Sequence, residues 1–146
     1  MNSTMTKVSV EISKPLIHGL GHITISVSDM KRSVHFYQTI FQCEPVLSQP
    51  KTVYFDVAGM WWALNIQNDI TREDIHSSYT HIALAVSAES LPELELNVKK
   101  AGAEIETGRK RDVEGEGQSI YFRDPDGHLL EFHTGTLQQR LDYYNA

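Results

Sequence analysis

An internal repeat constrains the fold of this chain more than any other feature of its sequence. Residues 21–28 (GHITISVS) align with residues 80–87 (THIALAVS) at a constant offset of 59 residues, with His, Ile, Val and Ser at matching positions. Both segments alternate apolar with small or polar residues, which is the period-two pattern of a half-buried strand. A repeat of this kind indicates one supersecondary unit used twice. We therefore expect two similar modules that pack together.

Each repeated strand leads into a predicted helix. Apolar residues recur at helical spacing within residues 30–41 of the first copy and within residues 91–101 of the second. Ser28 or Asp29 can cap the first helix. Gly102 is expected to end the second helix, because glycine accepts the left-handed conformation found after helix ends.

Strand-like runs follow each helix, among them residues 52–57 and 60–66 in the first copy and residues 118–122 and 128–133 in the second. The Asp-Pro-Asp-Gly sequence at 124–127 is a strong turn signal. The pattern predicts an α+β fold of two tandem βαβββ modules that form a cupped mixed β-sheet. Its expected parts are a flexible leader at 1–17 and a single domain at 18–146, with module one at about 18–68, module two at about 77–134 and a C-terminal helix at about 136–144.

Two segments of the chain lack periodicity. Residues 66–78 are polar and are expected to link the modules. Residues 107–118 contain three glycines and many charges, so we expect a loop that moves or closes over something.

Composition excludes several classes of function. The 146 residues, 40% hydrophobic and 22% charged, are typical of one soluble domain. A net charge of −6 with scattered lysines and arginines argues against a nucleic-acid partner. No apolar stretch approaches the roughly 20 residues that a membrane span needs, and the N-terminal stretch lacks the apolar core of a signal peptide. The single cysteine, Cys43, fits a reducing cytoplasm, which is the expected location.

His22 and His81 occupy the same position in the two repeated strands. If the modules pack about a pseudo-two-fold axis, these side chains can converge. Glu131 lies in an apolar strand, where a carboxylate is costly unless it is paired or metal-bound. Two imidazoles and one carboxylate suit a divalent manganese, iron, nickel or zinc ion. A single histidine in a strand is more often a hydrogen-bonded core residue than a metal ligand. The interpretation of His22 and His81 as metal ligands therefore depends on the repeat. The other histidines are expected on the surface, in turns or beside the ligands: His18, His35, His76, His128 and His133.

The first module lacks a counterpart of Glu131. Aligning the turn at Gly59 with the turn at Gly127, an offset of 68 residues, places Ala63 at the equivalent position. Three protein ligands with open positions are typical of a catalytic metal, whereas structural metals are usually enclosed. The predicted site is therefore catalytic, and its open positions would take substrate oxygen.

Several motifs resemble those of the fosfomycin resistance enzymes, which belong to the vicinal oxygen chelate superfamily together with glyoxalase I. The resemblance runs from about Leu20 to Tyr144, and the leader before it lies outside. The motifs are GHIT at 21–24, GMWWALN at 59–65, YTH at 79–81, SIYFRDPDGH at 119–128 and EFHTGTL at 131–137.

This resemblance implies the vicinal oxygen chelate (glyoxalase-like) fold and a metal held by His22, His81 and Glu131. The metal is usually Mn²⁺, with Mg²⁺, Ni²⁺ or Zn²⁺ as alternatives, and a role for K⁺ stays undecided. Such enzymes open the epoxide of the phosphonate fosfomycin by adding a thiol or water, with the metal as a Lewis acid. The resemblance also implies a homodimer in which one site takes His22 from one chain and the other two ligands from its partner.

Further residues acquire expected roles by the same resemblance. Thr24 matches a threonine that contacts the epoxide oxygen in glutathione-using members, whereas bacillithiol-using members usually carry cysteine there. Trp61 would form an apolar wall beside the substrate methyl group. The positions that hold the phosphonate correspond to Tyr79, Arg109, Ser119, Tyr121 and Arg140. In a purely structural interpretation, Tyr121 and Trp61 are core aromatic residues and Arg140 is a solvated charge.

The sequence constrains the nucleophile that is added to the epoxide less than it constrains the metal ligands. The Arg109 loop and the FHTGT run at 132–136 look most like the bacillithiol type, while Thr24 looks like the glutathione type. The branch that adds water carries a general-base glutamate in an insertion, and residues 49–53 are too short to hold it. We therefore expect a thiol transferase that uses bacillithiol, glutathione or cysteine. The alternatives are a fosfomycin epoxide hydrolase, another metalloenzyme of the superfamily and a metal-free antibiotic-binding protein.

Overall fold

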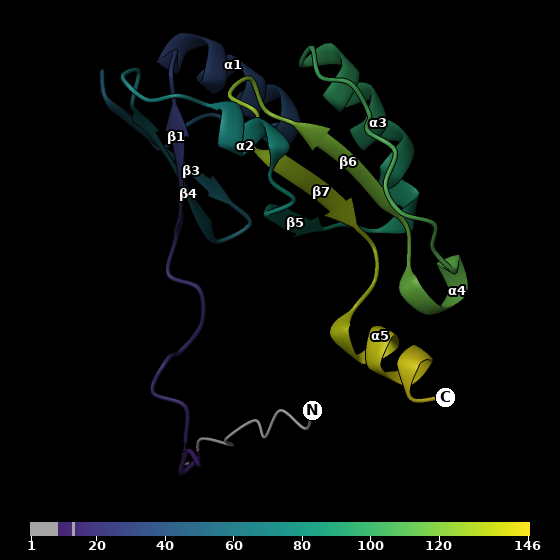
Figure 1. Cartoon of the computed structure of the whole chain (residues 1–146). Coiled ribbons are helices and arrows are strands. Elements are labelled where there is room, and N and C mark those ends of the chain that lie inside the picture. The colour runs from purple at the N-terminus through teal and green to yellow at the C-terminus, as the bar shows by residue number, and fades with distance from the viewer. Residues whose placement is uncertain (1–8, 13) are drawn as a thin grey trace, which may run out of the picture.

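The computed structural model describes residues 9–12 and 14–146, and the expected order of strand, helix and meander appears twice (Figure 1). Module one contains β1 (Ile23–Val27), α1 (Met30–Phe41), β2 (Leu47–Ser48), β3 (Thr52–Val57) and β4 (Met60–Ile66). Module two contains β5 (His81–Ala85), the 3₁₀ helix η1 (Ala88–Ser90), α3 (Leu91–Lys100), α4 (Val113–Glu116), β6 (Ser119–Arg123) and β7 (Leu129–His133). Helix α2 (Glu73–Ser77) lies between the modules, and α5 (Leu137–Tyr144) follows the second.

The strand register confirms the repeat. Sheet one has the order β1-β4-β3-β2 and sheet two the order β5-β7-β6. In each sheet the first strand of the module pairs in parallel with the last, while the other pairs are antiparallel. Thr24 lies opposite Ala63 in sheet one, and Ala83 lies opposite Glu131 in sheet two. Ala63 therefore occupies the position that Glu131 has in module two, as the sequence predicts.

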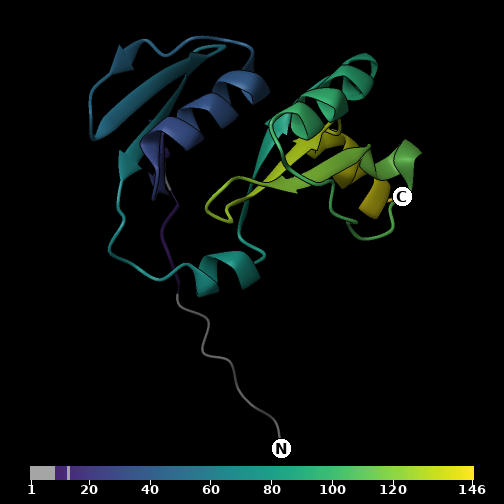
Figure 2. The same cartoon turned by 90° about the horizontal axis from the view of Figure 1, so that it is seen from above.

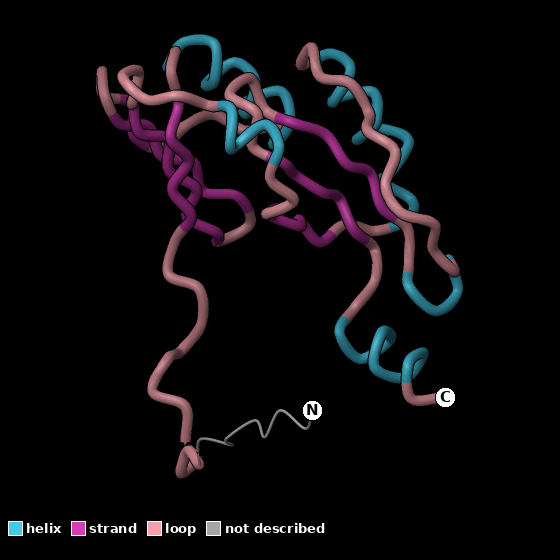
Figure 3. The backbone as a smooth tube through the Cα atoms, viewed as in Figure 1, coloured by secondary structure: helices cyan, strands magenta, loops and turns pink. Residues whose placement is uncertain are grey.

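Within one chain the two sheets remain separate. Strands β1 and β5 are both edge strands, and no pairing joins them among the described residues. Figures 1 and 3 show the two groups of strands diverging beneath the helices. A single chain therefore does not close the predicted cup. Edge strands leave backbone N–H and C=O groups unpaired along one side, so both edges are available for further pairing.

Helix α1 follows the predicted pattern. Asp29, one of the two expected caps, accepts a hydrogen bond from the backbone N–H of Arg32 at 3.0 Å. The apolar face buries Phe36, Tyr37 and Ile40. In module two, α3 ends at Lys100, and Gly102 follows it with a φ of +88°.

The modules share one hydrophobic core. Helices α1 and α3 contact each other, and α1 also packs on β4 (Figure 2). The ring of Phe36 in α1 lies 6.3 Å from the ring of Phe122 in β6, so module one reaches sheet two directly. Burying such side chains away from water stabilises each by about 1.5–3 kcal/mol. The relative position of the modules is thus fixed by apolar packing as well as by the chain connection.

Polar contacts fix the turn between β6 and β7 against module one. The hydroxyl of Tyr37 donates to Asp124 at 2.6 Å, and the backbone N–H of Ser28 donates to Asp126 at 3.0 Å. Gly127 completes the turn with a φ of +92°, as its place in the sequence predicts. This turn therefore joins the second module to the first helix of the chain.

The segments without periodicity contain short helices that the sequence did not indicate. Residues 66–78 include α2, and residues 107–118 include α4, whose cap is Asp112. The βαβββ pattern implies one more strand before β6, and in its place the structure has one bridge between Glu106 and Tyr121. The leader residues 9–12 and 14–17 form no helix or strand, and residues 1–8 and 13 lie outside the described part. No helix in the described residues is long and apolar enough to cross a membrane.

Candidate metal centre

Two of the three predicted metal ligands meet on sheet two. His81 begins β5 and Glu131 lies in β7, the strand that pairs with β5. His81 Nε2 lies 3.2 Å from Glu131 Oε1, and Glu131 is only 4% exposed. The other ring nitrogen of His81, Nδ1, lies 2.8 Å from the backbone oxygen of Tyr79.

This geometry fits a divalent metal. A carbonyl oxygen can only accept, so Nδ1 carries a proton and donates it, and in the neutral ring the Nε2 lone pair points at the carboxylate. Two acceptors 3.2 Å apart attract each other only through a proton or a cation. A histidine that donates its second nitrogen to a backbone carbonyl is the usual arrangement of a metal ligand. His81 and Glu131 therefore form a pair suited to holding a cation.

The second carboxylate oxygen of Glu131 is surrounded by donors. Arg111 Nη2 lies 3.2 Å from Oε2, His133 Nδ1 lies 3.4 Å from it, and the Ser119 hydroxyl donates to it. Burial lowers the pKa of His133, which favours a neutral ring. Ser119, expected at the phosphonate, is thus hydrogen-bonded to the metal ligand in this structure, and its hydroxyl also lies 2.7 Å from His133 Nδ1.

Sequence reasoning did not identify Arg111. The residue lies in the loop at 107–118, which has no periodicity and holds several other charges, so nothing in the sequence distinguishes it from its neighbours. His133 was expected on the surface, in a turn or beside the ligands, and the structure places it beside Glu131. Its signal was its position on the same strand, two residues after the ligand, because alternate residues share a face.

A cationic pocket of about 240 Å³ opens beside this pair. Its lining comprises Tyr79, His81, Arg109, Arg111, Tyr121, Glu131, His133 and Arg140. Arg109 forms an ion pair with Glu116, whereas the buried Nε of Arg140 has no hydrogen-bond partner in the described structure. Burial, the hydrogen bond with Tyr79 and the charge of Glu131 raise the pKa of Tyr121. Tyr121 is therefore a neutral donor at physiological pH, and the pocket suits an anion with several oxygens.

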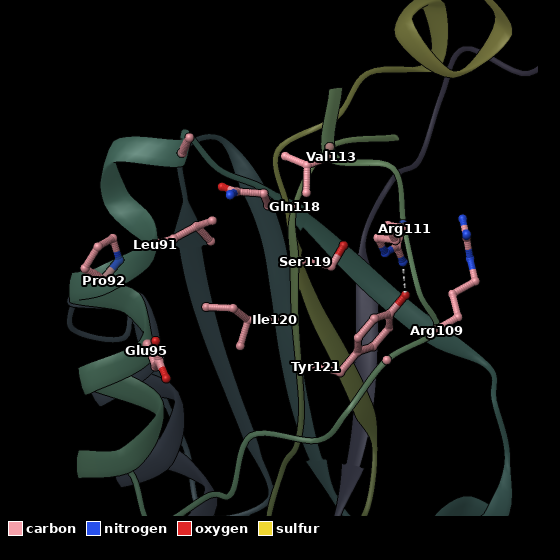
Figure 4. A pocket seen from close by; sticks show the side chains of 13 residues that line it. Leu91, Pro92, Glu95, Arg109, Arg111, Val113, Gln118, Ser119, Ile120 and Tyr121 are labelled. Atoms are coloured by element: carbon pink, nitrogen blue, oxygen red, sulfur yellow. Dashed lines mark hydrogen bonds between the residues drawn. The ribbon is translucent and has the colours of Figure 1, made fainter. Parts of the chain in front are cut away.

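Two of these arginines, Arg109 and Arg111, also border a larger hollow. Arg109, Arg111, Ser119 and Tyr121 line one side of a pocket of about 620 Å³, and α3 lines the other (Figure 4). In Figure 4 the guanidinium of Arg111 points at the Tyr121 hydroxyl, to which it donates a hydrogen bond. The loop at 107–118 thus contributes side chains to both hollows.

The remaining predicted residues lie together on sheet one. The rings of His22 and Trp61 lie 4.5 Å apart, and Tyr54 packs against Trp61 at 5.2 Å. Thr24 is exposed on β1, two residues after His22 and therefore on the same face. Trp61 is 44% exposed, so it is not a core aromatic residue.

A single chain does not bring all three predicted ligands together. Among residues 9–12 and 14–146, no group of three or more His, Cys, Asp or Glu residues could hold a metal ion. The predicted site residues instead form two half-sites. The sheet-one half-site contains His22, Thr24 and Trp61, and the sheet-two half-site contains Tyr79, His81, Arg109, Ser119, Tyr121, Glu131 and Arg140.

Comparison with known proteins identifies close relatives. A metallothiol transferase FosB from Shouchella clausii is 51% identical over 129 residues, covering 88% of each chain. A FosB from Lysinibacillus sphaericus is 46% identical over 128 residues, covering 88% of this chain and 90% of the relative. Among solved structures, the fosfomycin resistance protein FosX from Listeria monocytogenes, complexed with Mn(II) and sulfate, superposes with a TM-score of 0.78 at 38% identity, covering 88% of this chain and 99% of that one.

The match to a family model spans both modules of the fold. Residues 19–132 match the Glyoxalase/Bleomycin resistance protein/Dioxygenase superfamily, a range that begins before His22 and β1 and extends into β7, the strand of Glu131. The sequence repeat, the parallel pairing of first and last strands and the paired His81 and Glu131 agree with this match. The chain therefore belongs to the Glyoxalase/Bleomycin resistance protein/Dioxygenase superfamily.

Proposed function

We propose that this chain is a metal-dependent enzyme that inactivates fosfomycin by adding a low-molecular-weight thiol to its epoxide. The observation that carries the proposal is the sheet-two half-site, where the His81 and Glu131 pair adjoins a pocket lined by three arginines. A phosphonate carries negative charge on several oxygens, which suits such a pocket. The relatives named metallothiol transferase, up to 51% identical, support this choice of reaction.

We propose further that the active site is completed between two copies of the chain. His22 directly precedes β1, an edge strand of sheet one, while His81 begins β5, an edge strand of sheet two. Both edges lack a strand partner in the described part of the chain, and the half-sites carry complementary parts of the predicted set. A homodimer that joins β1 of one copy to β5 of the other would bring the histidines to one place and cover both edges.

In this proposal each half-site has a distinct task. A bound divalent ion, for which Mn²⁺ is the first choice given the Mn(II) in the FosX structure, would act as a Lewis acid on the epoxide oxygen. Arg140, Arg109 and the hydroxyls of Tyr79 and Tyr121 bind the phosphonate and fix its orientation. Thr24 donates to the epoxide oxygen, and Trp61 covers the methyl group and excludes water from that side. Holding the epoxide in one orientation aligns the carbon for attack by the thiol.

The thiol is proposed as bacillithiol, glutathione or cysteine. The proposed location is the cytoplasm, because the reaction consumes a free thiol and thiols stay reduced there. The test is to incubate purified protein with Mn²⁺, fosfomycin and each thiol, and to follow the phosphorus NMR signal of the phosphonate. A thiol-dependent new resonance supports the proposal. A diol formed without thiol would instead identify an epoxide hydrolase, and an unchanged spectrum with every thiol would refute both.

The shared site has its own test, which uses two inactive variants. His22→Ala removes a sheet-one ligand, and Glu131→Ala removes a sheet-two ligand. If each site takes one half from each copy, mixing and re-equilibrating the variants gives mixed dimers with one intact site in two. Random pairing then restores about one quarter of the activity of the unmodified protein. If each chain builds its own site, no mixture recovers activity.

A further inference from the structure

We propose that Arg111 is a positioning residue that links the metal ligand Glu131 to the substrate-binding hydroxyl of Tyr121. The inference rests on the proposed function, because it concerns the same metal and the same anion. Arg111 was not among the predicted site residues. Its role follows from its contacts, from its burial and from the fact that it contacts only one of the two carboxylate oxygens of Glu131.

The Arg111 side chain reaches both groups from the loop at 107–118. Its Nη2 lies 3.2 Å from Glu131 Oε2 and donates a hydrogen bond to the Tyr121 hydroxyl. The guanidinium carbon lies 5.7 Å from the centre of the Tyr121 ring. The Arg111 side chain is only 10% exposed, whereas the neighbouring Arg109 side chain is 43% exposed and pairs with Glu116. Arg111 is therefore held in place by two partners and is not a solvated charge.

These contacts leave one atom of each partner free for ligands. Arg111, Ser119 and His133 all contact Oε2 of Glu131, while Oε1 faces His81 Nε2. Fixing Oε2 therefore orients Oε1 toward the proposed metal position. At Tyr121 the hydroxyl oxygen accepts from Arg111 and lies 3.5 Å from the Tyr79 hydroxyl, so its own proton is directed away from Arg111, toward the Tyr79 hydroxyl or an oxygen of the substrate. One guanidinium thus orients a metal ligand and a substrate donor together.

The direction in which Mn²⁺ affinity changes distinguishes a positioning role of Arg111 from a purely electrostatic one. Removing a positive charge near a cation site by itself strengthens cation binding, because like charges repel. Losing an outer hydrogen bond to a metal ligand weakens metal binding, typically by about 10–100-fold. Weaker Mn²⁺ binding after loss of Arg111 therefore cannot come from the lost charge and is the result expected of lost positioning.

The experiment measures the Mn²⁺ dissociation constant of Arg111→Gln by the electron paramagnetic resonance signal of free Mn²⁺, which needs no turnover. We expect binding about 10–100-fold weaker than in the unmodified protein. The matched control is Lys110→Gln, which removes the same charge from the adjacent exposed position and should leave Mn²⁺ binding equal or slightly tighter. Circular dichroism and thermal unfolding confirm that each variant is folded. Should Arg111→Gln fail to fold, Arg111→Lys, which keeps the charge but loses the forked donor, takes its place with the same expected direction.

A second measurement tests the link to Tyr121. Inorganic phosphate serves as the probe of the anion pocket in Mn²⁺-saturated protein, with Arg111→Gln tested alone and together with Tyr121→Phe. If Arg111 acts on the anion through the Tyr121 hydroxyl, its loss weakens phosphate binding less in the Tyr121→Phe background than in the unmodified protein. Equal weakening in both backgrounds overturns the link.

The results that would refute the positioning role of Arg111 differ from those that would refute the proposed function. Mn²⁺ binding to Arg111→Gln that is as tight as in the unmodified protein, or tighter, overturns the positioning role even if the thiol adduct forms. Conversely, the absence of any thiol adduct refutes the proposed reaction while leaving the Mn²⁺ comparison valid.

Discussion

The hydrogen bond between Tyr37 and Asp124 joins the two modules in the core, and removing it should measurably destabilise the chain. The Tyr37 hydroxyl in α1 donates to Asp124 Oδ2 at 2.6 Å, across 87 positions of sequence. Tyr37 is fully buried and Asp124 is 4% exposed. The substitution Tyr37→Phe keeps the ring in the core and deletes only the donor. It therefore isolates the polar part of the contact between the modules.

The expected loss follows from what remains around the carboxylate. Asp124 Oδ1 keeps the backbone N–H groups of Asp126 at 3.0 Å and His128 at 2.9 Å, but Oδ2 loses its donor. A hydrogen bond to a charged group contributes about 1.5–3 kcal/mol, and a buried acceptor left without a donor is costly. We expect Tyr37→Phe to lower the free energy of unfolding by about this amount. For a chain of this length that corresponds to a drop in Tm of roughly 3–12 °C.

The carboxyl of Asp124 determines how the loss of unfolding free energy in Tyr37→Phe depends on pH. Burial raises the pKa of Asp124 in the folded chain above its ordinary value, while the Tyr37 hydrogen bond lowers it. The cost of burying the ionised carboxylate is thus fully present above the folded pKa and is relieved as the pH falls below it. Because Tyr37 stabilises the ionised form, the effect of Tyr37→Phe should be largest above that pKa and should shrink as the pH falls through it.

Urea unfolding at a fixed protein concentration, repeated from pH 7.5 downward, measures this difference. Tyr144→Phe is the matched control, because Tyr144 is exposed and should lose less than about 0.5 kcal/mol. If Tyr37→Phe also changes the free energy of unfolding by less than that, or if its effect grows as the pH falls, the reasoning about this buried contact is wrong.

Three further predictions follow from the same structure. Asp124→Asn should make the free energy of unfolding less dependent on pH in the acid range, since it removes the buried titrating carboxyl, and urea unfolding at two pH values measures this. Gly127→Ala should lower Tm more than Gly59→Ala: both positions have positive φ, but a Cβ at Gly127 would lie 2.7 Å from the His76 ring, whereas a Cβ at Gly59 meets nothing within 4 Å. Equal losses in the two glycine variants would exclude this contact as the cause. Arg140→Lys should raise the KM for fosfomycin about tenfold by losing a forked donor, and an unchanged KM would remove Arg140 from the anion pocket.

Much of the fold could be predicted because its signals are local. The alternation of apolar residues fixed the repeated strands, and the offsets of 59 and 68 residues correctly placed Ala63 as the counterpart of Glu131. The cap at Asp29 and the glycine after α3 also lie where residue type and spacing indicate. The short helices α2 and α4 could not be predicted, because segments of four or five residues show too little periodicity.

The sequence by itself determined the two modules and the order of strand and helix along each, and it predicted His81 and Glu131 among the ligands of one site, since repeat and alternation specify which residues share a face. Only the tertiary structure decided that His22 lies on a separate sheet from that pair, that Ser119 and His133 contact the carboxylate, and that Arg111 joins Glu131 to Tyr121. These contacts depend on how an aperiodic loop folds back and on how two sheets are oriented. Neither is encoded in any local pattern, because both are set by packing between residues far apart in the chain.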